Sequence, residues 1–304
     1  MKDKVIYVLA GPTASGKSDI ALRLAEMTGG EILCMDSMQV YRGMDIGTAK
    51  PTAQERRRVP HHLLDLCSPE EPFSVSDWAE RCRPLLKSVR VPILTGGTGL
   101  YLDAVSWDQD FGAVGADAGI RARYHAIADS EGTAALYTIL RERDPAAASR
   151  LHPNDIRRVV RALEVLDLTG KSITSFGSRI APAGLDFRIF AVDWPRDRLY
   201  RRIEERVDRM MADGLKEEVL ALRRRGVPRD ATAIQGLGYK ELYDHFDSAV
   251  SLDEAVRNIK VRTRHYAKRQ LTWFRRDERV RWIPSEKISD APAIILSSAP
   301  NGSD

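Results

Sequence analysis

The sequence lacks the features that place a chain in a membrane or in a disulfide framework. No apolar run in its 304 residues approaches the roughly 18 residues that cross a bilayer, and the N-terminal apolar stretch is too short for a signal peptide. Its three cysteines, Cys34, Cys67 and Cys82, are odd in number and have no metal-ligand spacing. We therefore expect a reduced, cytoplasmic protein with no membrane partner.

Internal repeats and a strong charge excess are also missing. The formal net charge is only +4, and the contents of hydrophobic residues (43%) and charged residues (30%) are those of an ordinary globular protein. The basic excess lies in the second half of the chain. We expect a monomer with one large α/β domain and a smaller inserted unit.

The most informative segment is a glycine loop of the pattern G-x-x-x-x-G-K-[ST]. It consists of Gly11, Pro12, Thr13, Ala14, Ser15, Gly16, Lys17 and Ser18. An apolar run at residues 5–10 predicts a buried strand before it, and the pattern at residues 19–27 predicts a helix after it. This context indicates a phosphate-binding loop, in which Lys17 contacts phosphates and Ser18 is a ligand of Mg²⁺.

Further apolar runs predict a parallel sheet. They lie at residues 5–10, 31–35, 91–95 and 187–192, and residues 280–283 can add an edge strand. The fold class is therefore α/β, with a P-loop NTPase-like core. Ligands in such sheets bind outside the carboxyl ends of the strands, so we expect the first three strand ends to form one site.

Helical patterns fill the rest of the chain. Between the strands they predict helices at residues 120–130, 133–143, 145–151 and 155–169. A long amphipathic helical region covers residues 197–225, and a basic helix covers residues 252–274. We thus expect a core formed by residues 1–112 and 185–304, with a helical insertion at residues 113–184.

The second and third strand ends carry the other candidate catalytic groups. Asp36 follows the second strand, where an aspartate can bind Mg²⁺, act as a general base or cap the next turn. The third strand ends in Gly96-Gly-Thr-Gly, and the hydroxyl of Thr98 can donate to a departing anionic oxygen. The chain has no Asn-Lys-x-Asp segment, which disfavours a GTPase.

Together these segments resemble the tRNA dimethylallyltransferase family, also called tRNA isopentenyltransferases. The similarity is carried by residues 11–18, 36–51, 95–101, 161–172 and 263–275, in which DSMQVYRGMDIGTAKP and YAKRQLTWFR are the most specific. The resemblance implies transfer of a dimethylallyl group from dimethylallyl diphosphate to N6 of the tRNA adenine at position 37, adjacent 3′ to the anticodon. This is alkyl transfer, with Mg²⁺ as cofactor and a tRNA anticodon stem-loop as partner, and its products are N6-isopentenyladenosine and diphosphate.

The resemblance also implies roles for individual residues. Lys17, Asp36 and Thr98 are the expected catalytic residues, with Asp36 as the base that takes the N6 proton. The expected tRNA-binding residues are Asp36, Ser37, Met38, Gln39, Thr98, Arg121, Arg157, Arg158, Val159, Val160, Arg161, Gln235, Gly238, Tyr239, Lys240, Lys268, Arg269, Gln270 and Arg275. For the Gln235–Lys240 segment, a glycine turn with Tyr239 packed under it remains an equal alternative.

Three other functions remain as alternatives. An isopentenyltransferase acting on a free nucleotide needs the same loop and base, but leaves the basic helix without a purpose. A small-molecule kinase that binds ATP leaves Asp36 without a role, and a non-catalytic RNA-binding protein does not explain Lys17 and Ser18. The pair His61-His62 is expected to make structural hydrogen bonds, because neighbouring side chains on an extended segment point to opposite sides.

Overall fold

The structure, a computed structural model, describes residues 3–107, 115–176 and 180–298. The chain forms two compact units, a core unit of residues 1–106 and 182–304 and a helical unit of residues 107–181. The expected boundary between residues 112 and 113 lies outside the described residues. None of the described helices has the length and apolar character needed to span a membrane.

The core unit contains a six-stranded sheet in the order β3-β2-β4-β1-β5-β6. Its strands are β1 Lys4–Ala10, β2 Glu31–Cys34, β3 His61–His62, β4 Pro92–Thr95, β5 Leu185–Asp193 and β6 Val280–Pro284. All neighbouring strands are parallel, which confirms the predicted α/β class. Thr95 of β4 pairs with Leu9 on one side and with Cys34 on the other, so the first three predicted strand ends meet at one edge.

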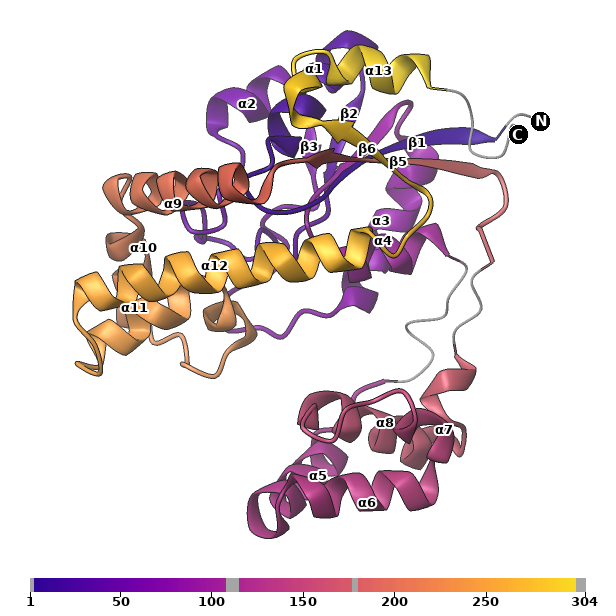
Figure 1. The fold of residues 1–304 in the computed structure, drawn as a ribbon, viewed down its shortest axis with the longest axis vertical. Helices are drawn as coiled ribbons and strands as arrows, with labels where there is room; N and C mark the ends of the chain where they lie inside the picture. Colours follow the sequence, from indigo (N-terminus) through magenta and orange to yellow (C-terminus); the bar gives the residue numbers. More distant parts are fainter. Residues whose placement is uncertain (1–2, 108–114, 177–179, 299–304) are drawn as a thin grey trace. The chain divides into compact units, whose positions relative to one another are not determined.

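Helices cover both faces of this sheet (Figure 1). The helices of the core unit are α1 Lys17–Thr28, α2 Ala53–Arg58, α3 Val75–Ser88, α4 Gly99–Ser106, α9 Arg196–Ala212, α10 Leu215–Arg224, α11 Tyr239–Phe246, α12 Leu252–Phe274 and α13 Ala291–Ser297. Figure 1 shows α1 and α13 on one face, and α3 and α4 on the other. Burial of apolar side chains between helix and sheet is the main source of stability for such layers.

Two clusters show how the faces are packed. On the first face, Ile20 of α1 and Ile295 of α13 are fully buried in one apolar cluster with residues of the central strands. On the second face, Trp78 of α3 stacks on Tyr101 of α4 with ring centroids 4.5 Å apart. The indole of Trp78 also donates to the backbone oxygen of Cys34 at 3.0 Å, which attaches α3 to the end of β2.

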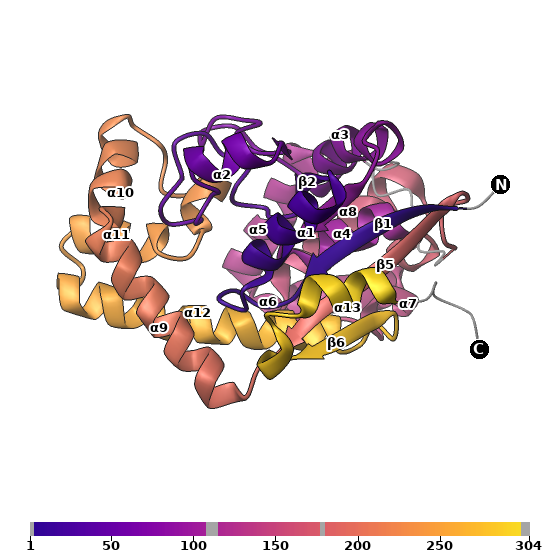
Figure 2. The ribbon, with the colours of Figure 1, turned by 90° about the horizontal axis from the view of Figure 1, so that it is seen from above.

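Helices α9 to α12 extend from one end of the sheet (Figure 2). The helical region expected at residues 197–225 is two helices, because Gly214 adopts a left-handed conformation (φ 100°) between α9 and α10. The basic helix α12 has the predicted bounds, and the hydroxyl of Ser251 caps its first turn by accepting from the Glu254 amide.

The helical unit is built from short helices around its own apolar core. They are α5 Ala118–Glu131, α6 Thr133–Arg143, α7 Pro145–Ala148 and α8 Ile156–Thr169. Asp155 caps the start of α8, and Gly170 ends it in a left-handed conformation. Leu140 and Leu163 are fully buried in this core.

Candidate active site

The phosphate loop connects β1 to α1 in the shape that the glycine pattern predicts. Gly11 and Gly16 have positive φ values of 119° and 87°, which residues with a Cβ rarely adopt. The carbonyl oxygens of Ala14 and Ser15 are bonded to the core, since Arg202 donates to the first at 2.8 Å and Trp194 to the second at 2.9 Å. Hydrogen bonds from Arg202 and Trp194, which lie outside the loop, thus fix its conformation.

The hydroxyl of Ser15 is a further indication that the loop is built for an anion. It is buried, and among the described residues it is one of two buried side-chain polar atoms without a hydrogen-bond partner. Unpaired buried polar groups cost free energy, and a phosphate oxygen is the partner that such a loop normally receives.

Two cations lie beside this loop. Lys17 donates to the carbonyl of Pro12 at 3.1 Å. Burial and the neighbouring Arg206 lower the pKa of Lys17 to about 8, although Asp36 acts in the opposite direction. Burial also lowers the pKa of Arg206, and again Asp36 opposes the shift. An anion bound beside Lys17 and Arg206 would stabilise their charged forms, which burial disfavours.

Sequence reasoning missed Arg206. It lies on α9 among the apolar residues Ile203, Val207 and Met210, on the face of the helix that packs inward. A single arginine within an apolar stripe was the available signal. Among the described residues no hydrogen bond or ion pair engages its guanidinium. Arg206 lines two cavities of the core unit.

One cavity of the core unit, named the main cavity because Asp36 and residues of the phosphate loop line it, has a volume of about 520 Å³. Polar lining comes from the phosphate loop, from residues 36–39 and 47–51, and from residues 235–239, 269 and 270. Apolar lining is supplied by Leu22, Ile32, Met210, Leu215 and Ile259. A second cavity of about 750 Å³ shares Lys17, Ser18 and Arg206 with the first. The main cavity therefore offers an apolar wall next to a cationic one.

Asp36 lies on the wall of the main cavity, at the end of β2. Its Oδ1 accepts the amide of Met38 at 2.9 Å, which fixes the orientation of the carboxylate. The capping role that the sequence left open is therefore present, and the carboxylate also faces the cavity. Ser37, Met38 and Gln39 line the same cavity.

Thr98 lies next to Ser37 in the turn between β4 and α4. Its hydroxyl oxygen accepts the amide of Ser37 at 3.2 Å, while its own amide donates to the carbonyl of Met35 at 3.3 Å. Tyr266 also bonds to this hydroxyl, and burial raises the pKa of Tyr266, so that it remains a neutral phenol. Thr98 connects the second strand end to the third.

Gln39 stabilises the cavity wall from within. Its amide nitrogen donates to the carbonyls of Thr48 at 2.9 Å and Ala49 at 3.1 Å. Its oxygen accepts from the thiol of Cys34 at 3.0 Å, and burial raises the pKa of that thiol far above its usual range. The side chain expected to contact the acceptor base is therefore held by both ends.

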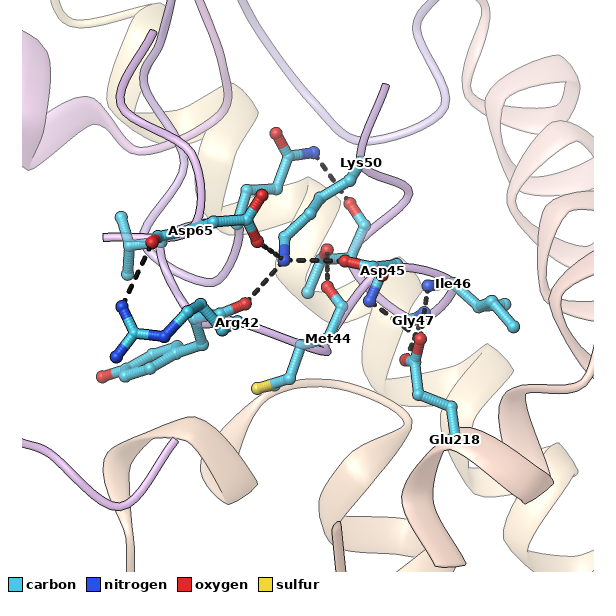
Figure 3. A network of polar contacts seen from close by, with 12 residues as sticks. Arg42, Met44, Asp45, Ile46, Gly47, Lys50, Asp65 and Glu218 are labelled. Atoms are coloured by element: carbon cyan, nitrogen blue, oxygen red, sulfur yellow. Dashed lines mark hydrogen bonds and ion pairs between the residues drawn. The ribbon is translucent and has the colours of Figure 1, made fainter. Parts of the chain in front are cut away.

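Lys50, which itself lines the main cavity, stabilises the same wall (Figure 3). Its side chain is only 1% exposed, and its ammonium donates to the Tyr41 carbonyl at 2.6 Å, to Asp45 at 2.8 Å and to Asp65 at 2.6 Å. Burial would raise the pKa of Asp65, but hydrogen bonds from Lys50 and Arg56 outweigh it and lower that pKa. Because these three bonds compensate the buried charge of Lys50, they fix the chain segment around Lys50.

Gln270 of α12 is buried and bonded inside the protein. Its oxygen accepts the Thr13 amide at 2.9 Å, and its nitrogen donates to the Gly97 carbonyl at 2.9 Å. A Cβ at Gly97 would lie 1.9 Å from that nitrogen, which explains the glycine. The residue expected to contact tRNA thus also connects the phosphate loop to the turn after β4.

The other candidates on α12 are nearer to the surface. Lys268 is exposed, and Arg269 lines the main cavity with its guanidinium 5.6 Å from the centre of the Tyr266 ring. Arg275, directly after the helix, is exposed and lies 3.4 Å from Asp193.

The residues of the Gln235–Lys240 segment separate into two groups. Gln235 is exposed and lines the cavity, and Lys240 is half-buried. Gly238 has a φ of 91° and donates its amide to Glu241 at 2.8 Å. Tyr239 is 1% exposed, so the alternative in which it packs under a glycine turn describes its position.

In the helical unit, Arg121 and Arg161 are bonded to one carboxylate. Their distances to the two oxygens of Glu164, which is fully buried, are 2.8 Å and 2.7 Å. Hydrogen bonds from both arginines keep the pKa of Glu164 low, against the effect of burial. This ion triad holds both guanidinium groups in fixed positions.

The remaining candidates on α8 differ in exposure. Val159 and Val160 are buried in the core of the helical unit, so their side chains pack inside it. Arg157 and Arg158 are exposed, the latter 3.4 Å from Asp155.

Ser18 is the residue that could hold Mg²⁺ together with phosphate oxygens. Within the described ranges, no group of three or more His, Cys, Asp or Glu side chains could hold a metal. Ser18, however, lines the cavity beside Lys17, and Mg²⁺ commonly takes one or two protein oxygens and completes its shell with phosphates and waters. Ser18 fits that role.

His61 and His62 make structural hydrogen bonds, as expected. They form β3, where His61 contacts the Val59 carbonyl at 2.8 Å and His62 contacts Glu31 at 2.6 Å.

Comparison with known proteins agrees with this geometry. The chain matches the family described as IPP transferase over residues 39–277, and the family described as isopentenyl transferase over residues 4–65. It is 44% identical to the tRNA dimethylallyltransferase of Pelotomaculum thermopropionicum over 303 residues, covering 98% of this chain and 96% of that protein. The tRNA dimethylallyltransferase of Geobacillus kaustophilus is 48% identical over 288 residues, with coverages of 93% and 91%.

Solved structures give the same result. The full-length tRNA isopentenylpyrophosphate transferase from Bacillus halodurans superposes with a TM-score of 0.72 at 43% identity, covering 97% of this chain and 96% of that one. A eukaryotic dimethylallyltransferase described as acting on tRNA superposes with a TM-score of 0.79 at 25% identity, covering 99% of this chain and 81% of that one. With relatives this similar along almost its whole length, the chain belongs to the IPP transferase family.

Proposed function

We propose that this chain transfers a dimethylallyl group from dimethylallyl diphosphate to N6 of the tRNA adenine at position 37, adjacent 3′ to the anticodon. One observation carries the proposal: Lys17, Arg206 and Asp36 line the same cavity as a group of apolar side chains. The cations suit a diphosphate, the apolar wall suits a five-carbon chain, and the carboxylate suits the proton of an amine. The names of the relatives support this assignment.

At the donor end, the phosphate loop, Lys17 and Arg206 bind the diphosphate and neutralise the charge that grows as it departs. Bound Mg²⁺, held by Ser18 and the phosphates, would neutralise a further part of that charge. Thr98 donates its hydroxyl hydrogen to the departing oxygen. Its oxygen already accepts the Ser37 amide, which orients the hydroxyl group.

At the acceptor end, Asp36 acts as the base. A bond forms between N6 and the primary allylic carbon while the bond from that carbon to the diphosphate oxygen breaks. The N6 proton passes to Asp36, and the diphosphate leaves with the bonding electron pair. We assign the proton to Oδ2, because Oδ1 accepts the Met38 amide. An exocyclic amine is a weak nucleophile, so removal of its proton during bond formation lowers the barrier.

The adenine must leave the stack of the anticodon loop to enter the cavity. Ser37, Met38 and Gln39 line the main cavity together with Asp36, which supports a role for them in reading such a base. Lysines and arginines are the usual contacts to RNA phosphates. We propose two groups of phosphate contacts. The first, on or after α12, is Lys268, Arg269 and Arg275, and the second, in the helical unit, is Arg157 and Arg158 with Arg121 and Arg161 fixed by Glu164.

The test supplies the protein with dimethylallyl diphosphate labelled in its carbon chain. Label should enter unmodified bulk tRNA and should not enter free AMP or ATP; the Asp36→Asn variant serves as the control for the chemical step. Label in the free nucleotide but not in tRNA would support the alternative acceptor. Transfer of the γ-phosphate of labelled ATP to a small molecule, without prenyl transfer, would support a kinase.

A further inference from the structure

Glu218 of α10 makes an unusual set of contacts with the Asp45–Gly47 turn, which leads into the cavity wall (Figure 3). Its Oε2 accepts the amides of Asp45 at 2.8 Å and Ile46 at 2.7 Å, and its Oε1 accepts the amide of Gly47 at 3.1 Å. Three consecutive backbone amides therefore converge on one carboxylate. Hydrogen bonds to an ionised acceptor are stronger than neutral ones, so this turn is held firmly to α10.

Tyr239 of α11 completes the arrangement. Its hydroxyl donates to Oε1 of Glu218 at 2.6 Å. Burial and the charge of Glu218 raise the pKa of Tyr239 well above its usual value, so that the phenol keeps its proton. A Cβ at Gly47 would lie only 2.6 Å from the hydroxyl oxygen of Tyr239, which means that the loop rests directly on the tyrosine.

The residues after this turn lead to the cavity. Thr48 and Ala49 follow Gly47 in the chain, and their carbonyls accept the side-chain amide of Gln39. Gly47, Thr48, Ala49 and Gln39 all line the main cavity. Within the described residues, Glu218 is not part of either cavity lining, so it can influence the main cavity only through the residues that it holds, the loop and Tyr239.

We propose that Glu218 is a positioning residue, which with Tyr239 clamps the Asp45–Gly47 turn and thereby holds the acceptor-facing wall of the cavity in its reactive geometry. This inference rests on the proposed function, because the wall that it fixes is the one that meets the adenine. It also gives the tyrosine of the Gln235–Lys240 segment a role inside the protein. Loss of the clamp leaves the phosphate loop, Lys17 and Arg206 in place.

The experiment compares Glu218→Gln with Glu217→Gln. Both remove one negative charge from the first turn of α10, but Glu217 is exposed and makes none of the loop contacts. Hydrogen exchange of the amides of residues 45–49 should accelerate by roughly tenfold in Glu218→Gln, while exchange in β1 and β5 stays unchanged. The single-turnover rate at saturating donor and tRNA should fall by roughly 10–100-fold, the scale set by small misplacements of reacting groups. Donor affinity should stay within about threefold of that of the wild type.

Tyr239→Phe keeps the ring against Gly47 and removes a single hydrogen bond. It should produce a smaller change in the same direction, and adding it to Glu218→Gln should produce little more, because the two residues act as one unit. Normal loop exchange or a normal single-turnover rate in Glu218→Gln would overturn the proposal. So would accelerated exchange throughout the core unit, since Glu218 would then stabilise the fold in general. If the wild-type protein does not label tRNA, the proposed function is contradicted. The hydrogen-exchange result can still be interpreted, because it does not depend on activity.

Discussion

Replacing Asp36 by asparagine tests its proposed role as the general base, because the substitution preserves the local geometry. Asparagine has nearly the same shape, and its oxygen can still accept the Met38 amide that now bonds to Oδ1 at 2.9 Å. The turn should therefore keep its conformation. What disappears is the negative charge and the ability to take a proton. A positioned general base contributes a factor of about 10²–10⁴, or roughly 3–5 kcal/mol of transition-state stabilisation.

The same substitution has an electrostatic consequence for the donor site. Asp36 raises the pKa of Lys17, which is about 8 in the wild type because burial lowers it. Without the carboxylate the pKa of Lys17 falls further. More of the lysine is then neutral between pH 7 and 8, and binding of the diphosphate weakens as the pH rises through that window. Below the lowered pKa the ammonium stays charged in both proteins, so donor affinity near pH 6 should not fall.

The assay is single-turnover transfer of labelled dimethylallyl groups to unmodified tRNA, with donor affinity measured by calorimetry at pH 6 and pH 8. Asp19→Asn is the matched control, because Asp19 also acts electrostatically on Arg206 but lies in the first turn of α1 and not on the main cavity. Its rate should stay within about threefold of the wild type. If Asp36→Asn also turns over within about threefold, Asp36 is not the base. If its donor affinity changes equally at both pH values, the coupling to Lys17 is wrong.

Substitutions at three further residues test the rest of the site. Thr98→Ala should lower kcat by roughly 10²–10³-fold with little effect on the KM of the donor, and Thr98→Ser should restore most of it; a raised KM with kcat intact would make Thr98 a binding residue. Arg206→Gln should weaken donor binding by roughly 10–100-fold in calorimetry, the value of about 1.5–3 kcal/mol for a hydrogen bond to a charged group, and unchanged affinity would remove it from the donor site. Arg157→Gln should reduce the slope of log K against log salt for tRNA binding by roughly 0.7–0.9, and an unchanged slope would make Arg157 an ordinary solvated surface residue.

Much of the core could be predicted because its signals are local. The phosphate loop, the buried strands and the helix α12 are defined by residues close together in the sequence, and they appear where those patterns indicated. The strand β3 was missed because two residues are too few for a periodic pattern. The break between α9 and α10 depends on the conformation of a single residue, Gly214, inside an otherwise continuous apolar stripe.

The site shows a different limit of sequence reasoning. A sequence reveals which side chains are available, whereas their partners are decided by folding. Arg206 was missed because its role depends on the direction of one side chain on α9, towards Lys17 and the cavity. Tyr239 belonged to a segment expected to contact RNA, yet its hydroxyl bonds to Glu218, which lies on α10.

Contacts of this kind inside the protein also explain why the most specific segments of this chain, DSMQVYRGMDIGTAKP and YAKRQLTWFR, are long. A phosphate loop needs few residues, because backbone amides and one lysine do most of the binding. Alkyl transfer to a base needs two substrates held at one carbon, so the donor loop and the acceptor wall must have a fixed separation. Gln270 contributes to this by binding the Thr13 amide and the Gly97 carbonyl from α12, the helix that also carries the cations proposed to contact RNA. Residues that connect the donor loop to the acceptor wall must therefore be positioned as accurately as the residues that contact the substrates.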